Sequence, residues 1–486
     1  MGLAARYAPS LALFTDLYEL TMAHAYLQAG LGSRRGAFQL FFRSCPFGGA
    51  FALAAGLADA LDYLATLRFE TADLDYLADQ RDTEGQPLFP EDFLHYLEGL
   101  RPDLDVDAVP EGTVVFPHEP LLRVEGPLPV AQLVESALLN LVNFQTLIAT
   151  KAARVKEAAA GAPVLEFGLR RSQGPDGALS VARASFIGGC DATSDVLGGR
   201  LFGVPVKGTH AHSWVMAFDR EEEAFDAWAE AQPGNCIFLV DTYDTLRGVE
   251  HAIAAARRLR ERGHEMVGIR LDSGDLDSLA RAAREMLDRA GFEGAKIFAS
   301  GDLDEYRIAR LTRAGAPIDV YGVGTRLSTA FDEPALGGVY KLVAIETEAG
   351  QWSPRLKRSS SEEKATYPGR QAVLRIRDRS GRIVRDVLHR AGRAPTRYVD
   401  PADPACVHPI EAGLPTEPLL VPAMRRGQVV MDPVDLPSIR ARARAQLDAL
   451  PEAVRRLEKP ETYPVSVEAE LFQLRRRLLE EAAHHA

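Results

Sequence analysis

Short apolar runs alternate with longer amphipathic stretches between about residues 164 and 323. Runs of this length, bounded by glycine, proline or polar residues, are typical of buried strands. Strands are predicted over 164–169, 185–187, 204–206, 236–240, 266–271, 295–299 and 318–321. Helices rich in Ala, Leu, Arg and Glu are predicted over 222–231, 246–262, 276–290 and 305–314. Strands that alternate with helices indicate right-handed β–α–β units and a parallel sheet.

The chain ends have a different pattern, which mixes helices with short β-like runs. Asp16 and Glu19 resemble a capping box at the start of a helix that ends at Gly30. Further helices are predicted over 50–67, 130–160, 436–450 and 466–482, and strands over 37–42, 113–116, 121–124, 372–376 and 383–388.

Nearly every strand of the central region ends in a polar or glycine-rich cluster. These clusters lie at 168–171, 188–191, 207–212, 241–243, 272–275, 300–302 and 322–326. An α/β barrel gathers its chemistry from the carboxyl ends of many strands, whereas a doubly wound sheet concentrates it at one or two points. The distribution therefore favours a barrel.

Charge and composition restrict the possible partners. The 486 residues carry a formal net charge of −12, which argues against nonspecific binding to nucleic acid or to an anionic membrane. An anionic substrate must then be held by a local cationic cluster. The four cysteines form no C-x-x-C pair, so reduced thiols are expected. We predict no signal peptide, no apolar window long enough for a membrane span, and a cytoplasmic protein.

Several of the strand-end clusters contain candidate chemistry. The glycine turns at 300–302 and 322–326, the latter with Arg326, favour phosphate binding, although tight turns alone would also need glycine. Asp272 could hold ribose hydroxyls or Mg²⁺, or stabilise a developing sugar cation, and Asp275 could simply cap a helix.

Two further clusters allow more than one interpretation. His210 and His212 lie two apart in a predicted extended segment, so both side chains would point the same way, as in a metal site. The lack of a third imidazole at any other predicted strand end argues against a metal site, and packed or exposed histidines are the alternative. Arg170 and Arg171 offer planar donors for a carboxylate or phosphate, or form a solvated pair.

Six segments together resemble the nicotinate phosphoribosyltransferase family. They occur in the family's order and span about residues 10–345. The segments are 13–22 (Leu-Phe-Thr-Asp-Leu-Tyr-Glu-Leu-Thr-Met), 42–49 (Phe-Arg-Ser-Cys-Pro-Phe-Gly-Gly), 166–171 (Glu-Phe-Gly-Leu-Arg-Arg), 208–214 (Gly-Thr-His-Ala-His-Ser-Trp), 270–275 (Arg-Leu-Asp-Ser-Gly-Asp) and 321–325 (Tyr-Gly-Val-Gly-Thr).

The resemblance implies an irregular α/β barrel of the type II phosphoribosyltransferase kind, with an auxiliary α+β domain built from both chain ends. We expect residues 1–128 and 344–486 to form the auxiliary domain and residues 129–343 the catalytic barrel. The implied reaction converts nicotinate and 5-phosphoribosyl 1-diphosphate into nicotinate mononucleotide and pyrophosphate, coupled to ATP hydrolysis. Mg²⁺ is the implied cofactor, and a homodimer with shared active sites is implied.

The resemblance also implies roles for particular residues. His212 would be the transiently phosphorylated histidine, oriented by Asp241 or Asp272, whereas His210 falls on a variable position without a role. Asp272 is the second catalytic candidate. The expected nicotinate-binding residues are Tyr18, Phe167, Arg170, Thr209 and Arg270, with Tyr18 entering the neighbouring subunit's site. The expected phosphoribosyl diphosphate-binding residues are Asp191, Asp275, Ser300, Gly301, Asp302, Gly322, Gly324 and Thr325.

Three alternatives stay open at this point. A nicotinamide-specific phosphoribosyltransferase would have the same fold, since the choice between acid and amide can depend on one residue. A metal-dependent barrel hydrolase would use His210, His212 and Asp272. A non-catalytic relative would retain the fold without the reaction.

Overall fold

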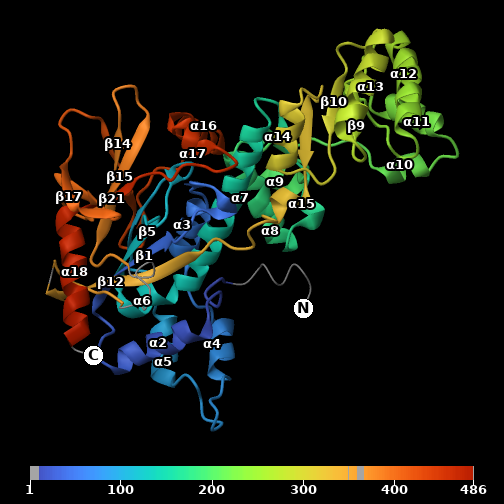
Figure 1. The fold of residues 1–486 in the computed structure, drawn as a ribbon. Coiled ribbons are helices and arrows are strands. Elements are labelled where there is room, and N and C mark those ends of the chain that lie inside the picture. The colour runs from blue at the N-terminus through green and yellow to red at the C-terminus, as the bar shows by residue number, and fades with distance from the viewer. Residues whose placement is uncertain (1–9, 349, 358–365, 485–486) are drawn as a thin grey trace. The chain divides into compact units, whose positions relative to one another are not determined.

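The computed structural model describes residues 10–348, 350–357 and 366–484, which form two units (Figure 1). Unit 1 contains both chain ends: residues up to Thr146, Leu336–Asp435 and Ala445 onward. Unit 2 comprises Leu147–Ala335 and Leu436–Arg444. The predicted boundaries lay at 128/129 and 343/344. In the structure the first boundary lies between Thr146 and Leu147, inside helix α7 (Glu135–Ala158), which continues from one unit into the other without a break.

Six parallel strands form the sheet of unit 2, in the order β7-β6-β11-β10-β9-β8. They are β6 (Val164–Glu166), β7 (Ala192–Thr193), β8 (Ile237–Leu239), β9 (Gly268–Leu271), β10 (Lys296–Ala299) and β11 (Val320–Val323). The first and last of the series, β6 and β11, pair with each other. The strands therefore follow one another around a ring, as predicted for a barrel.

The ring has one irregular place, between β7 and β8. A single parallel bridge joins Thr193 to Val206 beyond β7. In the described sheet order β8 pairs only with β9, so no ladder links the Val206 segment to β8.

The predicted strand at 185–187 is wrong, because these residues end helix α8 (Gly174–Ile187). A short apolar run inside an amphipathic helix looks like a buried strand in sequence. The actual strand is β7. The cluster 188–191 therefore follows a helix and precedes a strand, which places it at the amino edge of the sheet.

Helices connect the strands of unit 2 and cover them. They are α9 (Val196–Phe202), α10 (His212–Met216), α11 (Glu221–Ala231), α12 (Thr245–Glu261), α13 (Leu276–Arg289), α14 (Glu305–Arg313) and α15 (Thr325–Ser328), with 3-10 turns at Leu169–Arg171 and Pro233–Asn235. Figure 1 shows α12 and α13 beside β9, and these elements are in contact. Asp244 and Asp304 accept backbone N–H groups at the starts of α12 and α14, which fixes where these helices begin.

Unit 1 contains a seven-stranded sheet with the order β13-β12-β1-β5-β3-β19-β20. Its strands are β1 (Arg35–Phe42), β3 (Asp105–Ala108), β5 (Leu122–Pro127), β12 (Gly338–Glu348), β13 (Gln351–Pro354), β19 (Val421–Arg425) and β20 (Gln428–Val429). A small pair, β2 (Ala52–Leu53) and β4 (Val114–Val115), lies apart from it. Strands from both chain ends thus pair within one sheet, as the predicted auxiliary domain requires.

A second sheet of unit 1 has the order β17-β16-β21-β15-β14-β18. Its strands are β14 (Gln371–Arg377), β15 (Ile383–Arg390), β16 (Arg397–Asp400), β17 (Asp403–Pro409), β18 (Thr416–Pro418) and β21 (Val465–Glu468). The predicted helix over 466–482 is therefore wrong at its start, because α18 (Ala469–His484) begins only after β21.

The other helices of unit 1 are α2 (Leu17–Gln28), α3 (Leu57–Thr66), α4 (Thr71–Ala78), α5 (Glu91–Glu98), α6 (Leu128–Leu133) and α17 (Glu452–Arg455), with a 3-10 turn at Pro46–Gly48; α16 (Leu436–Ala449) crosses the unit boundary. The predicted capping box of α2 is wrong. Asp16 makes no side-chain cap, and buried Glu19 instead accepts the backbone N–H of Ser136, 2.9 Å away, at the start of α7. The Glu19 carboxylate therefore accepts a free backbone N–H at the start of α7, not one at the start of α2.

By length and composition, the joined stretch of α6 and α7 (Leu128–Ala158) would be able to cross a membrane, contrary to prediction. Yet 61% of its most apolar window is buried inside the protein. The prediction of no signal peptide depends on the chain start, where residues 1–9 lie outside the described part.

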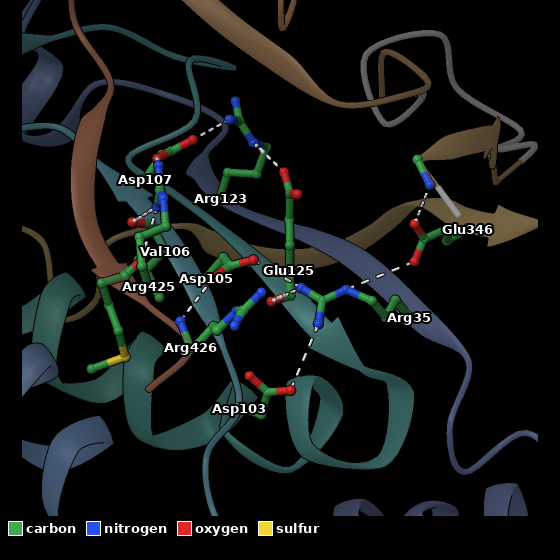
Figure 2. A network of polar contacts seen from close by, with 12 residues as sticks. Arg35, Asp103, Asp105, Val106, Asp107, Arg123, Glu125, Glu346, Arg425 and Arg426 are labelled. Carbon is green, nitrogen blue, oxygen red and sulfur yellow. Dashed lines mark hydrogen bonds and ion pairs between the residues drawn. The ribbon is translucent and has the colours of Figure 1, made fainter. Parts of the chain in front are cut away.

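A network of arginines and carboxylates crosses the seven-stranded sheet (Figure 2). Arg123 of β5 is 6% exposed and binds both Asp107 and Glu125, the latter at 2.7 Å. Its third nitrogen donates to the carbonyl of Gln371 at 2.6 Å, which joins the two sheets of unit 1. Arg35, more exposed, lies 2.9 Å from Asp105. Glu125 also binds Arg370 at 2.7 Å and Asp107 also binds Arg425, so Arg123 shares the two carboxylates with these arginines.

We predict that Arg123→Met lowers the free energy of unfolding by about 2 kcal/mol, because Asp107 and Glu125 each lose one of two arginine partners and the Gln371 carbonyl loses a donor. The matched control Arg35→Met should cost about 1 kcal/mol or less, since its ion pairs are partly exposed to water. Urea unfolding of both variants tests this. A smaller loss for Arg123 than for Arg35 would contradict it.

Candidate active site

A cavity of about 690 Å³ opens at the carboxyl ends of the strands in unit 2. Except for Arg307 of α14, the lining residues lie at or just after the carboxyl end of a strand of the ring or of the Val206 bridge. The lining residues are Phe167, Leu169, Arg170, Arg171, Ser194, Gly208, Thr209, His210, Ala211, Arg270, Asp272, Ser273, Gly274, Ser300, Gly301, Asp302, Arg307, Gly322, Gly324 and Thr325.

Cationic side chains outnumber carboxylates on the cavity wall, whereas the whole chain is acidic. Four arginines line the cavity, against the carboxylates of Asp272 and Asp302. The net charge of the chain is −12. This local excess of cations suits an anionic ligand, although the overall charge of the chain is negative.

Two glycines of the cavity are required by close packing. Gly301 has φ +88°, and a Cβ there would lie 1.7 Å from the carbonyl oxygen of Asp272. At Gly322 a Cβ would lie 2.7 Å from the ring of Phe167. The aromatic ring of Phe167 therefore lies against the bare backbone of β11. The backbone N–H of Phe167 donates to the carbonyl of Val323 at 2.8 Å.

Glu166 supports the turn that carries Phe167. Its carboxylate accepts the backbone N–H of Gly168 and the hydroxyl of Thr193, the latter at 2.6 Å. The side chain is 1% exposed, and this burial raises the pKa of Glu166. The turn is thus fixed by buried hydrogen bonds before any ligand arrives.

Arg270 is aimed into the cavity with unused donor capacity. Its Nη1 donates to the hydroxyl of Thr209 at 2.5 Å, while its buried Nε has no partner among the described residues. Burial lowers the pKa of Arg270, and nearby Asp272 and Asp241 raise it. An unpaired buried N–H beside a cavity favours an anionic or polar acceptor in a ligand.

Asp272 lies between the cavity and His212. Its Oδ1 accepts the hydroxyl of Ser300 at 2.5 Å, and its backbone N–H donates to Asp241 at 2.9 Å. Its Oδ2 lies 3.9 Å from Nε2 of His212. The Nδ1 of His212 lies 3.1 Å from the Thr242 hydroxyl. One imidazole thus faces a hydroxyl on one side and a carboxylate on the other.

The expected pairing of the two histidines is wrong. His212 begins helix α10, so the segment is not extended through both positions. His210 is 5% exposed, and its nitrogens contact the backbone N–H of Leu239 at 3.2 Å and the carbonyl of Ala211 at 3.4 Å. The described residues include no group of three His, Cys, Asp or Glu side chains that could hold a metal ion. A histidine-based hydrolase site therefore lacks support.

Comparison with known proteins agrees with this geometry. Residues 13–143 match the model of the nicotinate phosphoribosyltransferase N-terminal domain, and residues 370–475 match that of the C-terminal domain. A nicotinate phosphoribosyltransferase of Bacillus subtilis is 43% identical over 470 residues, covering 94% of this chain and 93% of that protein. This chain belongs to the nicotinate phosphoribosyltransferase family.

Two further relatives of the family extend the comparison. A nicotinate phosphoribosyltransferase of Mycobacterium tuberculosis is 46% identical over 458 residues, covering 94% of this chain and 91% of that protein. The crystal structure of human nicotinic acid phosphoribosyltransferase superposes with a TM-score of 0.83 at 35% identity, covering 96% of this chain and 99% of that one. The predicted fold, a type II phosphoribosyltransferase barrel with an auxiliary domain, is confirmed.

Most of the residues expected from the family resemblance line the one cavity. They are Phe167, Arg170, Thr209, Arg270, Asp272, Ser300, Gly301, Asp302, Gly322, Gly324 and Thr325. His212 adjoins it through Asp272. Their individual roles toward substrate stay predictions.

Asp191 and Asp275 do not line the cavity, and their expected contacts with phosphoribosyl diphosphate stay predictions. Asp191 lies at the amino edge of the sheet, where it binds Lys156 at 2.8 Å and Arg440 at 2.6 Å. Asp275 precedes α13 and accepts the hydroxyl of Ser278 at 2.6 Å. Tyr18 belongs to α2 of unit 1, and its predicted role stays a prediction.

Among the residues of the site that were not predicted, Arg307 and Thr242 contact residues that were. Arg307 lines the cavity and donates to the carbonyl of Gly301 at 2.9 Å. Its position in the first turn of the helix after the 300–302 cluster could have indicated it. Thr242, the partner of His212, directly follows Asp241, but nothing in the sequence pattern pairs it with His212.

We predict that Gly301→Ala destabilises the protein by about 2 kcal/mol or more, since both its φ and the nearby Asp272 carbonyl exclude a Cβ. The matched control is Gly208→Ala, in the same cavity, where a Cβ would meet nothing within 4 Å. Thermal unfolding of both variants measures the difference. Equal melting temperatures would contradict the assigned strain.

Proposed function

We propose that the cavity of unit 2 transfers the phosphoribosyl group of 5-phosphoribosyl 1-diphosphate to nicotinate, coupled to ATP hydrolysis through phosphorylated His212. The chain's membership of the nicotinate phosphoribosyltransferase family supports the transferase reaction. One observation supports the coupling: Asp272 lines the cavity and also lies 3.9 Å from the His212 imidazole.

Nicotinate is proposed to bind between Phe167 and Arg270. The ring of Phe167 offers an aromatic surface for the pyridine. The carboxylate of nicotinate would accept from the unpartnered Nε of Arg270, with Thr209 and Arg170 nearby. A neutral amide would gain less from these cations, which is why we propose the acid as substrate.

The glycine turns are proposed to hold the phosphoribosyl diphosphate. The turn of Ser300, Gly301 and Asp302 lines the cavity together with Gly322, Gly324 and Thr325. Bare backbone at these turns permits close approach of phosphate oxygens. Thr325 would contact the sugar 5-phosphate, as the resemblance implies.

The chemical step needs charge of both signs in one place. The ring nitrogen of nicotinate forms a bond to C1 of the ribose as the bond from C1 to the diphosphate oxygen breaks. Positive charge grows on the ribose, which the Asp272 carboxylate would stabilise, and negative charge grows on the diphosphate, which the arginines would stabilise.

Mg²⁺ is proposed to arrive with the diphosphate rather than to occupy a resident site. The described residues contain no cluster of three metal-binding side chains. Mg²⁺ in phosphate chemistry commonly uses one or two carboxylates together with phosphate oxygens. Asp272 and Asp302, both on the cavity wall, could supply such carboxylates.

The phosphorylation step would use a neutral His212. If its Nδ1–H donates to the Thr242 hydroxyl, 3.1 Å away, Nε2 keeps a lone pair that can attack the γ-phosphate of ATP. ADP then leaves, and water later cleaves the phosphorus–nitrogen bond to release phosphate.

A cytoplasmic homodimer with shared sites completes the proposal. Tyr18 is 46% exposed in the single chain, as are apolar neighbours such as Leu17 at 56%. Exposed large apolar side chains of this kind suit burial against a second copy. In the dimer, Tyr18 of each copy would enter the other's site.

We predict that His212→Ala abolishes both the stimulation of turnover by ATP and the acid-labile phosphate on the protein, because no other imidazole of the site is free to react. A product assay with nicotinate and phosphoribosyl diphosphate, with and without ATP, measures the first effect, and acid-labile incorporation of labelled phosphate measures the second. Transfer without ATP should persist at a reduced rate. Full retention of both signals in the variant would reject His212 as the phosphorylated residue.

We predict that Arg270→Ala weakens nicotinate binding by about 1.5–3 kcal/mol, roughly ten- to 150-fold, since one charge-assisted contact is lost. Binding of nicotinamide, which has no carboxylate, should change much less and serves as the internal control. The dissociation constants of nicotinate and nicotinamide, measured by titration of the wild-type protein and of the variant, test this prediction. An equal loss for both bases would remove the proposed carboxylate contact.

A further inference from the structure

The irregular place in the ring leaves one edge of β8 without a strand neighbour. In a closed ring, the segment after Val206 would be that neighbour, since Val206 bridges to Thr193 beyond β7. Among the described residues, no strand pairing joins this segment to β8. Yet Leu239 of β8 is fully buried, so its backbone N–H needs an acceptor.

The imidazole of His210 supplies that acceptor. Its Nε2 lies 3.2 Å from the backbone nitrogen of Leu239 and accepts its hydrogen. The ring is held edge-to-face against Trp228, with centroids 4.9 Å apart, and also packs near Phe225. A side chain thus takes the place of a strand carbonyl.

Both nitrogens of His210 are engaged, which selects one neutral form. Because Nε2 accepts, the proton is on Nδ1, which lies 3.4 Å from the carbonyl of Ala211 and donates to it. Burial is the main cause that lowers the pKa of His210 to about 4; the hydrogen bond to Ala211 opposes this lowering, and nearby Arg270 and His212 add to it. The acceptor is therefore available at neutral pH.

The neighbours of His210 on both sides belong to the site. Thr209 accepts from Arg270 inside the cavity, and Ala211 is the residue before His212. We propose that His210 is a positioning residue that anchors the Gly208–Ala211 loop to β8 and so places Thr209 and His212 for the reaction. The part concerning His212 rests on the proposed function.

The test compares His210→Leu, which fills the space without hydrogen bonds, with His210→Gln, whose amide can accept from Leu239 and donate to Ala211. We expect His210→Leu to slow phosphorylation of His212 at least tenfold and to raise the nicotinate KM at least fivefold. His210→Gln should recover both values to within about threefold of wild type. His264→Leu, at an exposed position, is the matched control and should leave both unchanged.

Two outcomes for the variants separate positioning from general stability. If His210→Leu folds and matches wild type in phosphorylation and in nicotinate KM, the inference is overturned. If both variants lose the same activity in proportion to a lower melting temperature, with no recovery in His210→Gln, it is also overturned.

A measurement on the unmodified protein covers the case in which His210→Leu does not fold. Amide hydrogen exchange should show Leu239 protected at pH 6 and progressively less protected as the pH falls through about 4, where His210 gains a proton and stops accepting. Val240, whose N–H donates to the Arg270 carbonyl, is the reference and should keep its protection. Unchanged relative protection of Leu239 would overturn the inference.

Failure of the proposed function gives a different result. If wild type carries no acid-labile phosphate and shows no ATP stimulation, the coupling through His212 is rejected. The nicotinate KM of the His210 variants and the exchange of Leu239 then decide whether His210 anchors the loop.

Discussion

The pairing of β11 with β6 is the contact on which unit 2 depends. It joins residues more than 150 positions apart in the chain, through bonds such as that from the Tyr321 N–H to the Pro163 carbonyl at 3.0 Å. Closing so long a loop costs chain entropy, which the shared burial of all six strands must offset. Because every strand in the ring is parallel, closure brings all their carboxyl ends to one rim. The cavity lies at that rim and is lined from several of its strand ends.

The ring of strands also brings the charged side chains of the site together. Four arginines line the cavity, and burial lowers the pKa of Arg270. The carboxylates of Asp272 and Asp241 partly compensate this cost. A substrate with a carboxylate and a diphosphate would complete the compensation, so a dianionic or more highly charged ligand fits better than a neutral one.

Unit 1 uses the same residue types for a different purpose. Its arginines and carboxylates pair with one another across the strands of the seven-stranded sheet (Figure 2). Arg123 also donates to the Gln371 carbonyl of the second sheet. With their donors satisfied inside the network, these groups position strands that come from both chain ends. Arg270 of unit 2 differs in this respect, because its Nε finds no partner in the part of the chain that the structure describes.

The local pattern of the sequence by itself determined much of the fold. Apolar runs followed by glycine or aspartate predicted β8 to β11 and the clusters at their carboxyl ends, and the quoted motifs identified the family. Only the tertiary structure decided that 185–187 is helical, that Asp191 therefore lies at the opposite edge of the sheet, and that Glu19 serves α7 rather than α2. It also decided that His210 completes β8 while His212 faces Asp272. These outcomes depend on which distant segment supplies each buried donor or acceptor with its partner, and no local pattern of apolar and polar residues contains that information.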